Sequence, residues 1–257
     1  MLYNLLQAIE QWLDDIGLYS LVQVMYQLEF RAFFSVVFSF LLVLFFGRRV
    51  IGWLIRMKIS DNPEFHNADL NQLMESRAAT PTMGGILIVG SMLVTTLLFA
   101  DLKEPYVHLA LLTMLWLAFL GAADDWLKLT VARRTPGSRE GLRTWEKLLF
   151  QMGLGFILGW QLYRHGSTDF GGHLGHVLTL PLQRTYLPGT NELSPSVIML
   201  GFPVFVLLTM LLVGGTSNAV NFTDGMDGLA TGCIVVASFA MMVLCYVAGD
   251  ADAARTL

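Results

Sequence analysis

Long apolar runs separated by short polar segments dominate the chain. A helix needs about 20 apolar residues to cross the hydrocarbon core of a bilayer, and about six runs reach or approach that length. They predict helices near residues 30–55, 83–100, 106–123, 148–163, 197–216 and 229–248. The pattern therefore predicts an all-α, polytopic membrane bundle in which residues 1–257 form a single integral-membrane domain.

Two segments outside these runs have a different character. Residues 2–26 mix apolar and acidic positions, so we expect them to lie at the membrane interface. They lack the basic start of a cleavable signal peptide. Residues 164–196 contain Gly171-Gly172 and three prolines, and alternating stretches there predict a short hairpin in an external loop.

Composition supports lipid as the main solvent of the chain. Apolar residues make up 54% and charged residues 14%, against about 25% charged in soluble domains. Mean hydropathy is +0.58. The net charge of −4 is too small to suggest a nucleic-acid partner. Cys233 and Cys245 both lie in an apolar run, so we expect neither a disulfide framework nor a zinc site.

Basic residues are distributed unequally between the connecting segments. Five follow the uncharged stretch of the first predicted span, residues 32–47, and six follow the third span, which places eleven of the 16 Lys and Arg residues on one side. The positive-inside rule assigns that side to the cytoplasm. The N-terminus then lies outside, and the cytoplasmic segments are residues 48–82, 124–147 and 217–228. The eleven are Arg48, Arg49, Arg56, Lys58, Arg77, Lys128, Arg133, Arg134, Arg139, Arg143 and Lys147.

The end of the third predicted span carries two adjacent carboxylates, Asp124 and Asp125. Charges beside a membrane span are costly, and a divalent cation or a basic partner would relieve their repulsion. If the helix continues, Lys128 shares their face, because residues three and four apart are neighbours on a helix. Two carboxylates and a lysine suit a Mg²⁺-assisted phosphate reaction. The alternative is a salt bridge that ends the span at the interface.

A second polar string, Asn218–Leu229, follows the fifth predicted span. Its polar side chains recur at every third position, which keeps them on one side of a helix or helix–loop segment. Amides and carboxylates in this arrangement can bind a metal or a nucleotide. The alternative is a polar turn between two spans. The four positions are Asn218, Asn221, Asp224 and Asp227.

A third string, Thr80–Gly85, precedes the second span. Hydroxyls and glycines at a helix N-terminus can receive an anion, although Pro81 also fits an ordinary helix start. In the basic loop at 128–147, which can contact lipid headgroups or a nucleotide, we single out Lys147. His173 and His176 lie three residues apart in the external loop, and we expect no metal site there.

Together, these three strings resemble those of the phospho-N-acetylmuramoyl-pentapeptide transferases. These enzymes belong to the polyprenyl-phosphate N-acetylhexosamine-1-phosphate transferase superfamily. The resemblance extends from about residue 30 to the end. It implies that undecaprenyl phosphate attacks UDP-MurNAc-pentapeptide to give lipid I and UMP in peptidoglycan biosynthesis. It also implies Mg²⁺ as cofactor and a multi-pass location in the bacterial inner membrane, with the active site facing the cytoplasm.

The resemblance assigns roles by motif position. Asp124 matches the residue proposed to deprotonate the lipid phosphate, although positioning and charge neutralisation can carry most of the rate if that phosphate is already ionised. The implied catalytic residues are Asp124, Asp125, Lys128 and Asp227. The implied substrate-binding residues are Thr82, Asn218, Asn221, Asp224, Lys147 and Arg77. The implied metal ligands are Asp125, Asp224 and Asp227.

Two features depart from the family pattern. Arg77 and Ala79 replace a lysine and a glycine, and arginine binds phosphate differently from lysine. The family also has further spans, another essential aspartate in a later loop and a His-His-His segment, whereas this chain ends at Leu257. We therefore expect the N-terminal part of a larger bundle, with little activity on its own.

Other functions fit the sequence less well. A sibling transferase that uses another UDP-N-acetylhexosamine would share the paired aspartates but not the full strings. A transporter would place charges near the bilayer midplane, often in paired repeats, and no internal repeat is visible. The expected partners are the two substrates and membrane lipid, and we also consider a homodimer.

Overall fold

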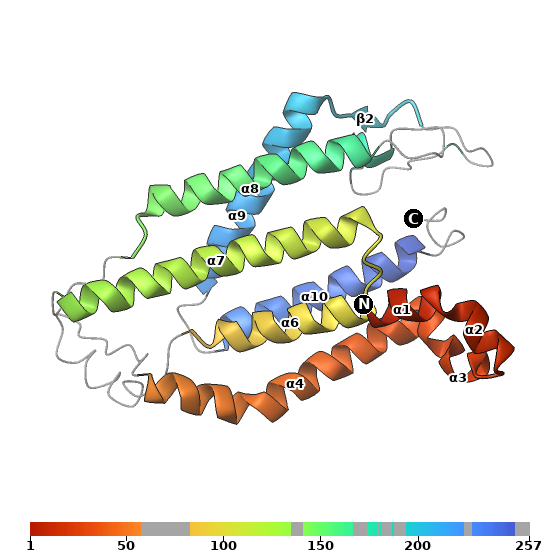
Figure 1. Ribbon diagram of the computed structural model, residues 1–257. Helices are drawn as coiled ribbons and strands as arrows, with labels where there is room; N and C mark the ends of the chain where they lie inside the picture. The colour runs from red at the N-terminus through yellow and green to blue at the C-terminus, as the bar shows by residue number, and fades with distance from the viewer. Residues whose placement is uncertain are drawn as a thin grey trace. The chain divides into compact units, whose positions relative to one another are not determined.

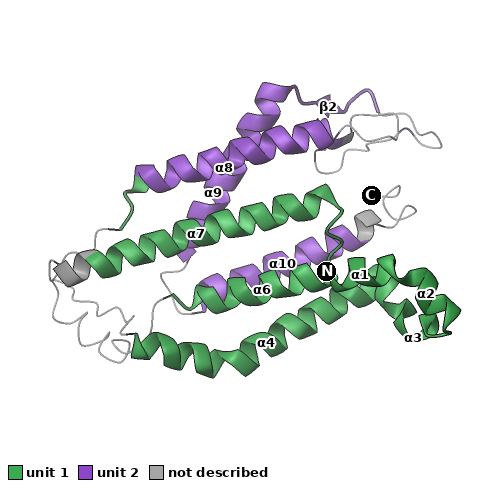
Figure 2. Ribbon diagram, viewed as in Figure 1, with its two compact units in different colours: residues 1–144 green, residues 145–257 purple. Residues whose placement is uncertain are grey.

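The computed structural model describes residues 1–57, 83–134, 141–166, 174–178, 180, 187, 194–223 and 228–249. The chain divides into two compact units, residues 1–144 and residues 145–257 (Figure 2). Nearly all regular structure in the described residues is helical (Figure 1). The predicted all-α class is confirmed.

Three long helices form the body of unit 1. Helix α4 spans Leu28–Arg56, α6 spans Gly85–Phe99 and α7 spans Pro105–Arg134. Helix α6 contacts both α4 and α7 (Figure 1). Inside the unit, the buried hydroxyls of Ser91 and Thr95 donate to carbonyl oxygens of their own helix at 2.8 and 2.7 Å. Both hydroxyls therefore have hydrogen-bond partners within α6 itself, so the helix can be buried between α4 and α7.

The outer face of α4 is strongly apolar. Large side chains along it are more than half exposed: Phe33, Val36, Phe40, Leu41, Leu44 and Phe45. An apolar surface of this extent is unfavourable in water and is normal where lipid surrounds a helix. The face of α4 therefore supports a membrane-embedded protein.

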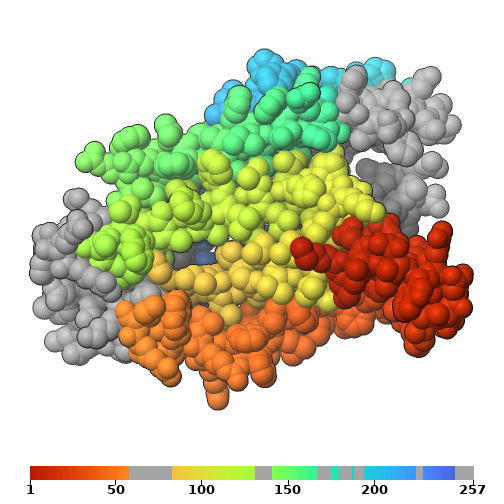
Figure 3. All heavy atoms as spheres, in the orientation of Figure 1, coloured from red at the N-terminus to blue at the C-terminus, as the bar shows by residue number. Residues whose placement is uncertain are grey.

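An N-terminal cap, residues 1–26, packs against the body of unit 1. It contains α1 (Leu2–Ala8), α2 (Glu10–Asp15), α3 (Tyr19–Val22) and the 3-10 helix η1 (Gln23–Tyr26). Figure 3 shows its red residues gathered at one end of the orange and yellow helices. The Asn4 amide donates to Asp101 at 2.8 Å, and the Arg31 guanidinium lies 3.8 Å from the centre of the Tyr3 ring. These contacts join the cap to α4 and to the segment between α6 and α7.

We expect acid to loosen this cap. Hydrogen bonds from the Lys103 N–H and the Asn4 amide hold the pKa of Asp101 below its usual range. A carboxyl group with a lowered folded-state pKa stabilises the fold above the ordinary value of about 3.9, and this stabilisation is lost as the pH falls through the folded pKa. Amide exchange in Leu2–Ala8, corrected for intrinsic rates, should therefore accelerate below about pH 4. If amide exchange in the Asp101→Asn variant accelerates over the same pH range, titration of Asp101 does not cause the acceleration.

Unit 2 contains the remaining helices. Helix α8 begins at the unit boundary and spans Thr144–His165, α9 spans Phe202–Thr223 and α10 spans Leu229–Gly249. Helices α8 and α9 approach closely at Gly155 and Gly159, two glycines four residues apart. A Cβ at Gly155 would lie 2.7 Å from the Met210 Cα, and one at Gly159 would lie 3.0 Å from the Val206 Cα. Such small-residue contacts are typical of helix pairs in membranes.

A short antiparallel strand pair lies outside the helices of unit 2. Strand β1 (Val177–Leu178) follows η3 (Leu174–His176) and pairs with β2 (Ile198–Met199), with Val177 opposite Met199. The predicted hairpin in residues 164–196 therefore needs correction, because its second strand lies beyond them. Residues 198–199 were predicted to begin a span, and α9 instead begins at Phe202. A short apolar run fits a strand or a helix equally well by periodicity alone.

The six predicted spans all correspond to helices in the described part of the chain. Four are long and apolar enough to cross a membrane: α4, α7 over Pro105–Thr130, α9 and α10 over Leu229–Tyr246. Helix α6 is apolar but has only 15 residues, about 22 Å of length against a core of about 30 Å. Helix α8 has 22 residues and carries charges near both ends. The protein is membrane-embedded, with two helices that differ from simple spans.

Candidate functional site

The first predicted cluster lies on one continuous helix. Helix α7 does not end with its apolar run near Ala123 but continues to Arg134. The Lys128 Nζ atom lies 2.7 Å from Asp124 Oδ2 and 3.9 Å from Asp125 Oδ1. The predicted sharing of one helix face by these three side chains is confirmed.

The three side chains differ in their access to solvent. The side chain of Asp124 is only 11% exposed, whereas the side chains of Asp125 and Lys128 are 37% and 45% exposed. A buried charge is costly unless it is paired, and Lys128 supplies the opposite charge. Asp124 therefore forms the inner part of the cluster, while Lys128 and Asp125 are the groups that a substrate can reach.

The chain returns to Asp124 after the end of α7. The backbone N–H of Leu142 donates to Asp124 Oδ1 at 2.9 Å. Both oxygens of this carboxylate therefore bind groups of unit 1: Lys128 at Oδ2 and the Leu142 backbone at Oδ1. The sequence interpretation missed Leu142, because a backbone donor leaves no signal in the side-chain pattern.

The second predicted cluster begins within α9, which extends to Thr223 and not to 216. The Asn218 amide donates to Gln151 Oε1 at 2.6 Å and to the Gly214 carbonyl at 2.7 Å. Gln151 in turn donates to Ser217 Oγ at 2.9 Å. The bonds from Asn218 to Gln151 and from Gln151 to Ser217 thus join α8 to α9, whereas the bond from Asn218 to Gly214 lies within α9. Gln151 was missed too, although a glutamine inside an apolar helix is a signal for a bond between helices.

We expect Gln151 and Asn218 to stabilise unit 2 jointly. Gln151→Leu and Asn218→Leu should each lower the free energy of unfolding by roughly 1 kcal/mol, since bonds between membrane helices have about this strength. Because the side chains share a bond, the double variant should cost less than the two single variants combined. Reversible unfolding of the wild type, the two single variants and the double variant in mixed micelles measures these free energies. Full additivity would mean that the bond contributes nothing.

The remaining predicted residues lie either in unit 2 or outside the described residues. Lys147 lies in the first turn of α8, within unit 2, and Asn221 is exposed near the end of α9. Four predicted residues lie outside the described residues: Arg77, Thr82, Asp224 and Asp227. The roles of all six stay predictions.

The third predicted cluster is described from Met83 onward. Met83 has a φ of +67°, in the left-handed region that residues other than glycine rarely adopt. Helix α6 begins two residues later. Backbone strain of this kind costs about 1–3 kcal/mol and is concentrated at functional sites. The functional interpretation of the Thr80–Gly85 string stays a prediction, because its residues 80–82 lie outside the described residues.

The chemistry of the cluster on α7 fits a magnesium ion. Mg²⁺ usually takes one or two protein carboxylates and completes its shell with water and substrate phosphate. Asp125 offers a partly exposed carboxylate of this kind. No set of three His, Cys, Asp or Glu side chains forms a metal cluster in the part of the chain that the structure describes.

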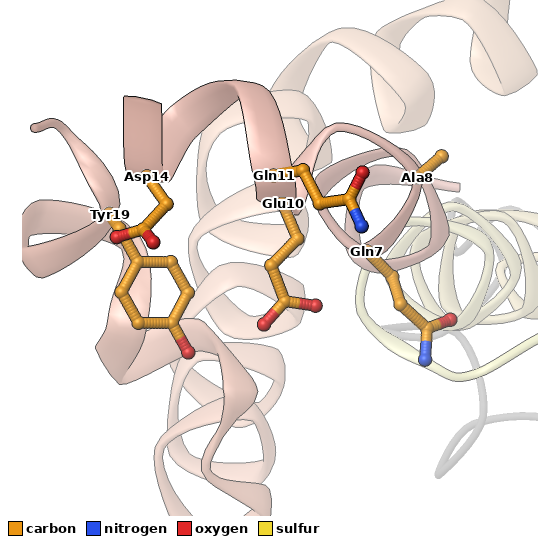
Figure 4. Close-up of a pocket in the computed structure, with 6 residues that line it drawn as sticks. All are labelled: Gln7, Ala8, Glu10, Gln11, Asp14 and Tyr19. Carbon is orange, nitrogen blue, oxygen red and sulfur yellow. The ribbon is translucent and has the colours of Figure 1, made fainter. Parts of the chain in front are cut away.

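A separate polar hollow lies in the N-terminal cap (Figure 4). Its lining residues are Gln7, Ala8, Glu10, Gln11, Asp14 and Tyr19. Partial burial raises the pKa of the Tyr19 phenol, and the charge and hydrogen bond of Glu10 raise it further. The cap lies at the end of unit 1 where α7 begins, and Asp124 follows Pro105 by roughly 28 Å of helix. The hollow is therefore distinct from the predicted site.

His176 has a structural environment. It is 6% exposed, its ring stacks on Tyr163 with centroids 3.8 Å apart, and its Nε2 contacts the Tyr163 carbonyl oxygen at 2.7 Å. His173 lies outside the described residues. The contacts of His176 connect the end of α8 to the segment that leads into β1.

These features define a class: a polytopic helical membrane protein with a carboxylate–lysine cluster on one spanning helix. The family model described as glycosyl transferase family 4 matches residues 107–257. The chain belongs to this family. The matched residues include the cluster on α7.

Three similar proteins carry the name phospho-N-acetylmuramoyl-pentapeptide-transferase. The one from Desulfotalea psychrophila is 34% identical over 232 residues, covering 88% of this chain and 56% of the relative. The one from Phocaeicola vulgatus is 30% identical over 281 residues, covering 100% of this chain and 64% of the relative. The one from Solibacter usitatus is 37% identical over 187 residues, covering 71% of this chain and 47% of the relative. The chain thus spans less than two thirds of these relatives, and the resemblance seen in its motifs is confirmed.

Proposed function

We propose that the protein containing this chain transfers phospho-MurNAc-pentapeptide from UDP-MurNAc-pentapeptide to undecaprenyl phosphate. An oxygen of the lipid phosphate attacks the β-phosphorus of the sugar nucleotide. A new P–O bond forms while the bond to UMP breaks, so the products are lipid I and UMP. The observation that carries this proposal is the Asp124–Lys128 ion pair beside Asp125, on a spanning helix of a chain whose relatives bear this transferase name.

Lys128 is the residue best placed to bind phosphate. Its ammonium has three N–H donors, and the bond to Asp124 uses one of them. The side chain is 45% exposed, so the other donors can reach a diphosphate oxygen. Asp124 orients the ammonium from the buried side. A fixed positive charge of this kind stabilises the charge that develops during transfer without needing to reorganise.

The proposed cofactor is Mg²⁺, held by Asp125 together with Asp224 and Asp227. When bound, such an ion neutralises charge on the diphosphate. We propose Thr82, Arg77, Asn221, Asp224 and Lys147 as further substrate contacts. Asn218 would contribute through its carbonyl oxygen, because its amide nitrogen already bonds to Gln151 and Gly214.

The two substrates explain a location at the membrane surface. Undecaprenyl phosphate is dissolved in the bilayer, and a nucleotide sugar is dissolved in the cytoplasm, so they meet at the interface. The eleven basic residues on one side support a cytoplasmic orientation for the site. We therefore propose the bacterial inner membrane, with the N-terminus outside. A homodimer stays a prediction.

The test is an assay of UMP release with both substrates and Mg²⁺. Full-length protein in nanodiscs should release UMP, and chelation with EDTA should stop the reaction. The 257-residue chain assayed in parallel should show little activity. UDP-GlcNAc in place of UDP-MurNAc-pentapeptide separates this proposal from a sibling transferase. No release from the full-length protein with UDP-MurNAc-pentapeptide would overturn the proposal.

A further inference from the structure

The segment that returns to Asp124 makes an unusually close approach. Gly141 lies so near α7 that a Cβ at this position would overlap Asp124 Oδ1 and would lie 3.1 Å from both Cγ and Cε of Lys128. Only glycine fits beside the ion pair without moving it. The next residue, Leu142, donates its backbone N–H to Asp124 at 2.9 Å. Steric fit and hydrogen bonding therefore place the same two residues against the same carboxylate.

The glycine is not explained by backbone conformation. Among the described glycines, a left-handed φ occurs at Gly17 and Gly228, and Gly141 is not one of them. Alanine could therefore adopt the backbone of residue 141, and the contact with Asp124 and Lys128 is the obstacle. Gly121 gives a useful comparison, because it lies one turn before Asp124 on the same helix and has nothing within 4 Å of an added Cβ.

We propose that Gly141 and Leu142 form a backbone clamp that positions Asp124 for the reaction. The Leu142 N–H holds Oδ1, which leaves Oδ2 directed at the Lys128 ammonium. Gly141 is the positioning residue, because its lack of a side chain lets the clamp close over the ion pair. The clamp acts through Asp124, which both of its residues contact. This inference rests on the proposed function and adds two positioning residues to its site.

The clamp predicts a specific kinetic signature in the full-length protein. Gly141→Ala should lower kcat by about tenfold or more, because the ion pair is displaced from its reactive geometry, and should leave KM for the nucleotide sugar within about twofold. Gly121→Ala should stay near the wild type. Equal effects of the two substitutions would overturn the clamp. So would a Gly141→Ala variant whose KM rises with kcat unchanged.

Two further measurements do not depend on turnover, and the first of them does not need the Gly141→Ala variant. Amide exchange at Leu142 should accelerate at least about tenfold in Asp124→Ala, because the acceptor of its N–H is gone, while amides in α6 keep their rates. Any loss of thermal stability in Gly141→Ala should shrink in Gly141→Ala/Asp124→Ala, where the overlapping atom is absent. Unchanged Leu142 exchange would overturn the clamp. If the wild type releases no UMP, the proposed function fails, and these measurements still decide whether the clamp exists.

Discussion

Asp124→Asn should lower UMP release by the full-length protein by at least about a hundredfold while the protein stays folded. Asparagine keeps the shape of the side chain and an oxygen that can accept the Leu142 N–H. It loses the negative charge that lies 2.7 Å from the Lys128 ammonium. Without this charge, Lys128 is no longer held in one orientation and cannot stabilise the transferring phosphate as well.

The same variant should fold, because Lys128 is not left buried without a partner. Its side chain is 45% exposed and can be hydrated when the ion pair is broken. Size-exclusion profiles and thermal unfolding test this part of the prediction. Asp101→Asn is a matched control in unit 1, since Asp101 bonds to the N-terminal cap and not to Lys128. A turnover rate for Asp124→Asn within threefold of the wild type would show that the site is misplaced.

Gly155→Ala should cause the largest loss of stability among single methyl additions in α8. Its Cβ would lie 2.7 Å from the Cα of Met210, which is a backbone atom that no rotamer change can move. Forcing extra volume into a packed contact costs typically about 1–3 kcal/mol. Because Gly155 lies between Gln151 and Gly159 along the contact with α9, the substitution should also separate Gln151 from Asn218.

A neighbouring glycine provides a control at which alanine should not lower the stability. Gly153 lies two residues earlier on the exposed side of α8, and an added Cβ there meets nothing within 4 Å. Gly153→Ala should therefore be neutral or stabilising, because alanine favours a helix by up to about 1 kcal/mol over glycine. Unfolding in mixed micelles compares the two variants directly. Equal stability of the Gly155→Ala and Gly153→Ala variants would show that α8 and α9 are not in close contact at Gly155.

The glycine contacts also connect stability to function. Helix α9 carries Asn218 and Asn221, and its position against α8 depends on Gly155 and Gly159. A substitution that separates the helices should therefore alter the predicted substrate contacts without touching them. The Asn218 amide is the first group to be affected, since its bond to Gln151 crosses between the two helices.

Much of the fold follows from the sequence, because lipid restricts what an apolar run can do. A backbone in hydrocarbon must satisfy its hydrogen bonds within the segment, so a long apolar run forms a helix whatever its neighbours are. This is why α4, α7 and α10 lie where the pattern predicts them. The pairing of Asp124 with Lys128 was predictable for a similar reason, since four residues along a helix is a local distance.

The tertiary structure decided the contacts that join distant parts of the chain. Leu142 reaches Asp124 across 18 positions, and Gln151 reaches Asn218 across 67. Strand β2 replaced the start of a predicted helix because β1 lies beside it. Such contacts depend on the path of the connecting segments and on which small residues permit a close approach. The carboxylate–lysine cluster could therefore be predicted from the sequence, whereas the backbone that holds Asp124 from the other side became visible only in the folded chain.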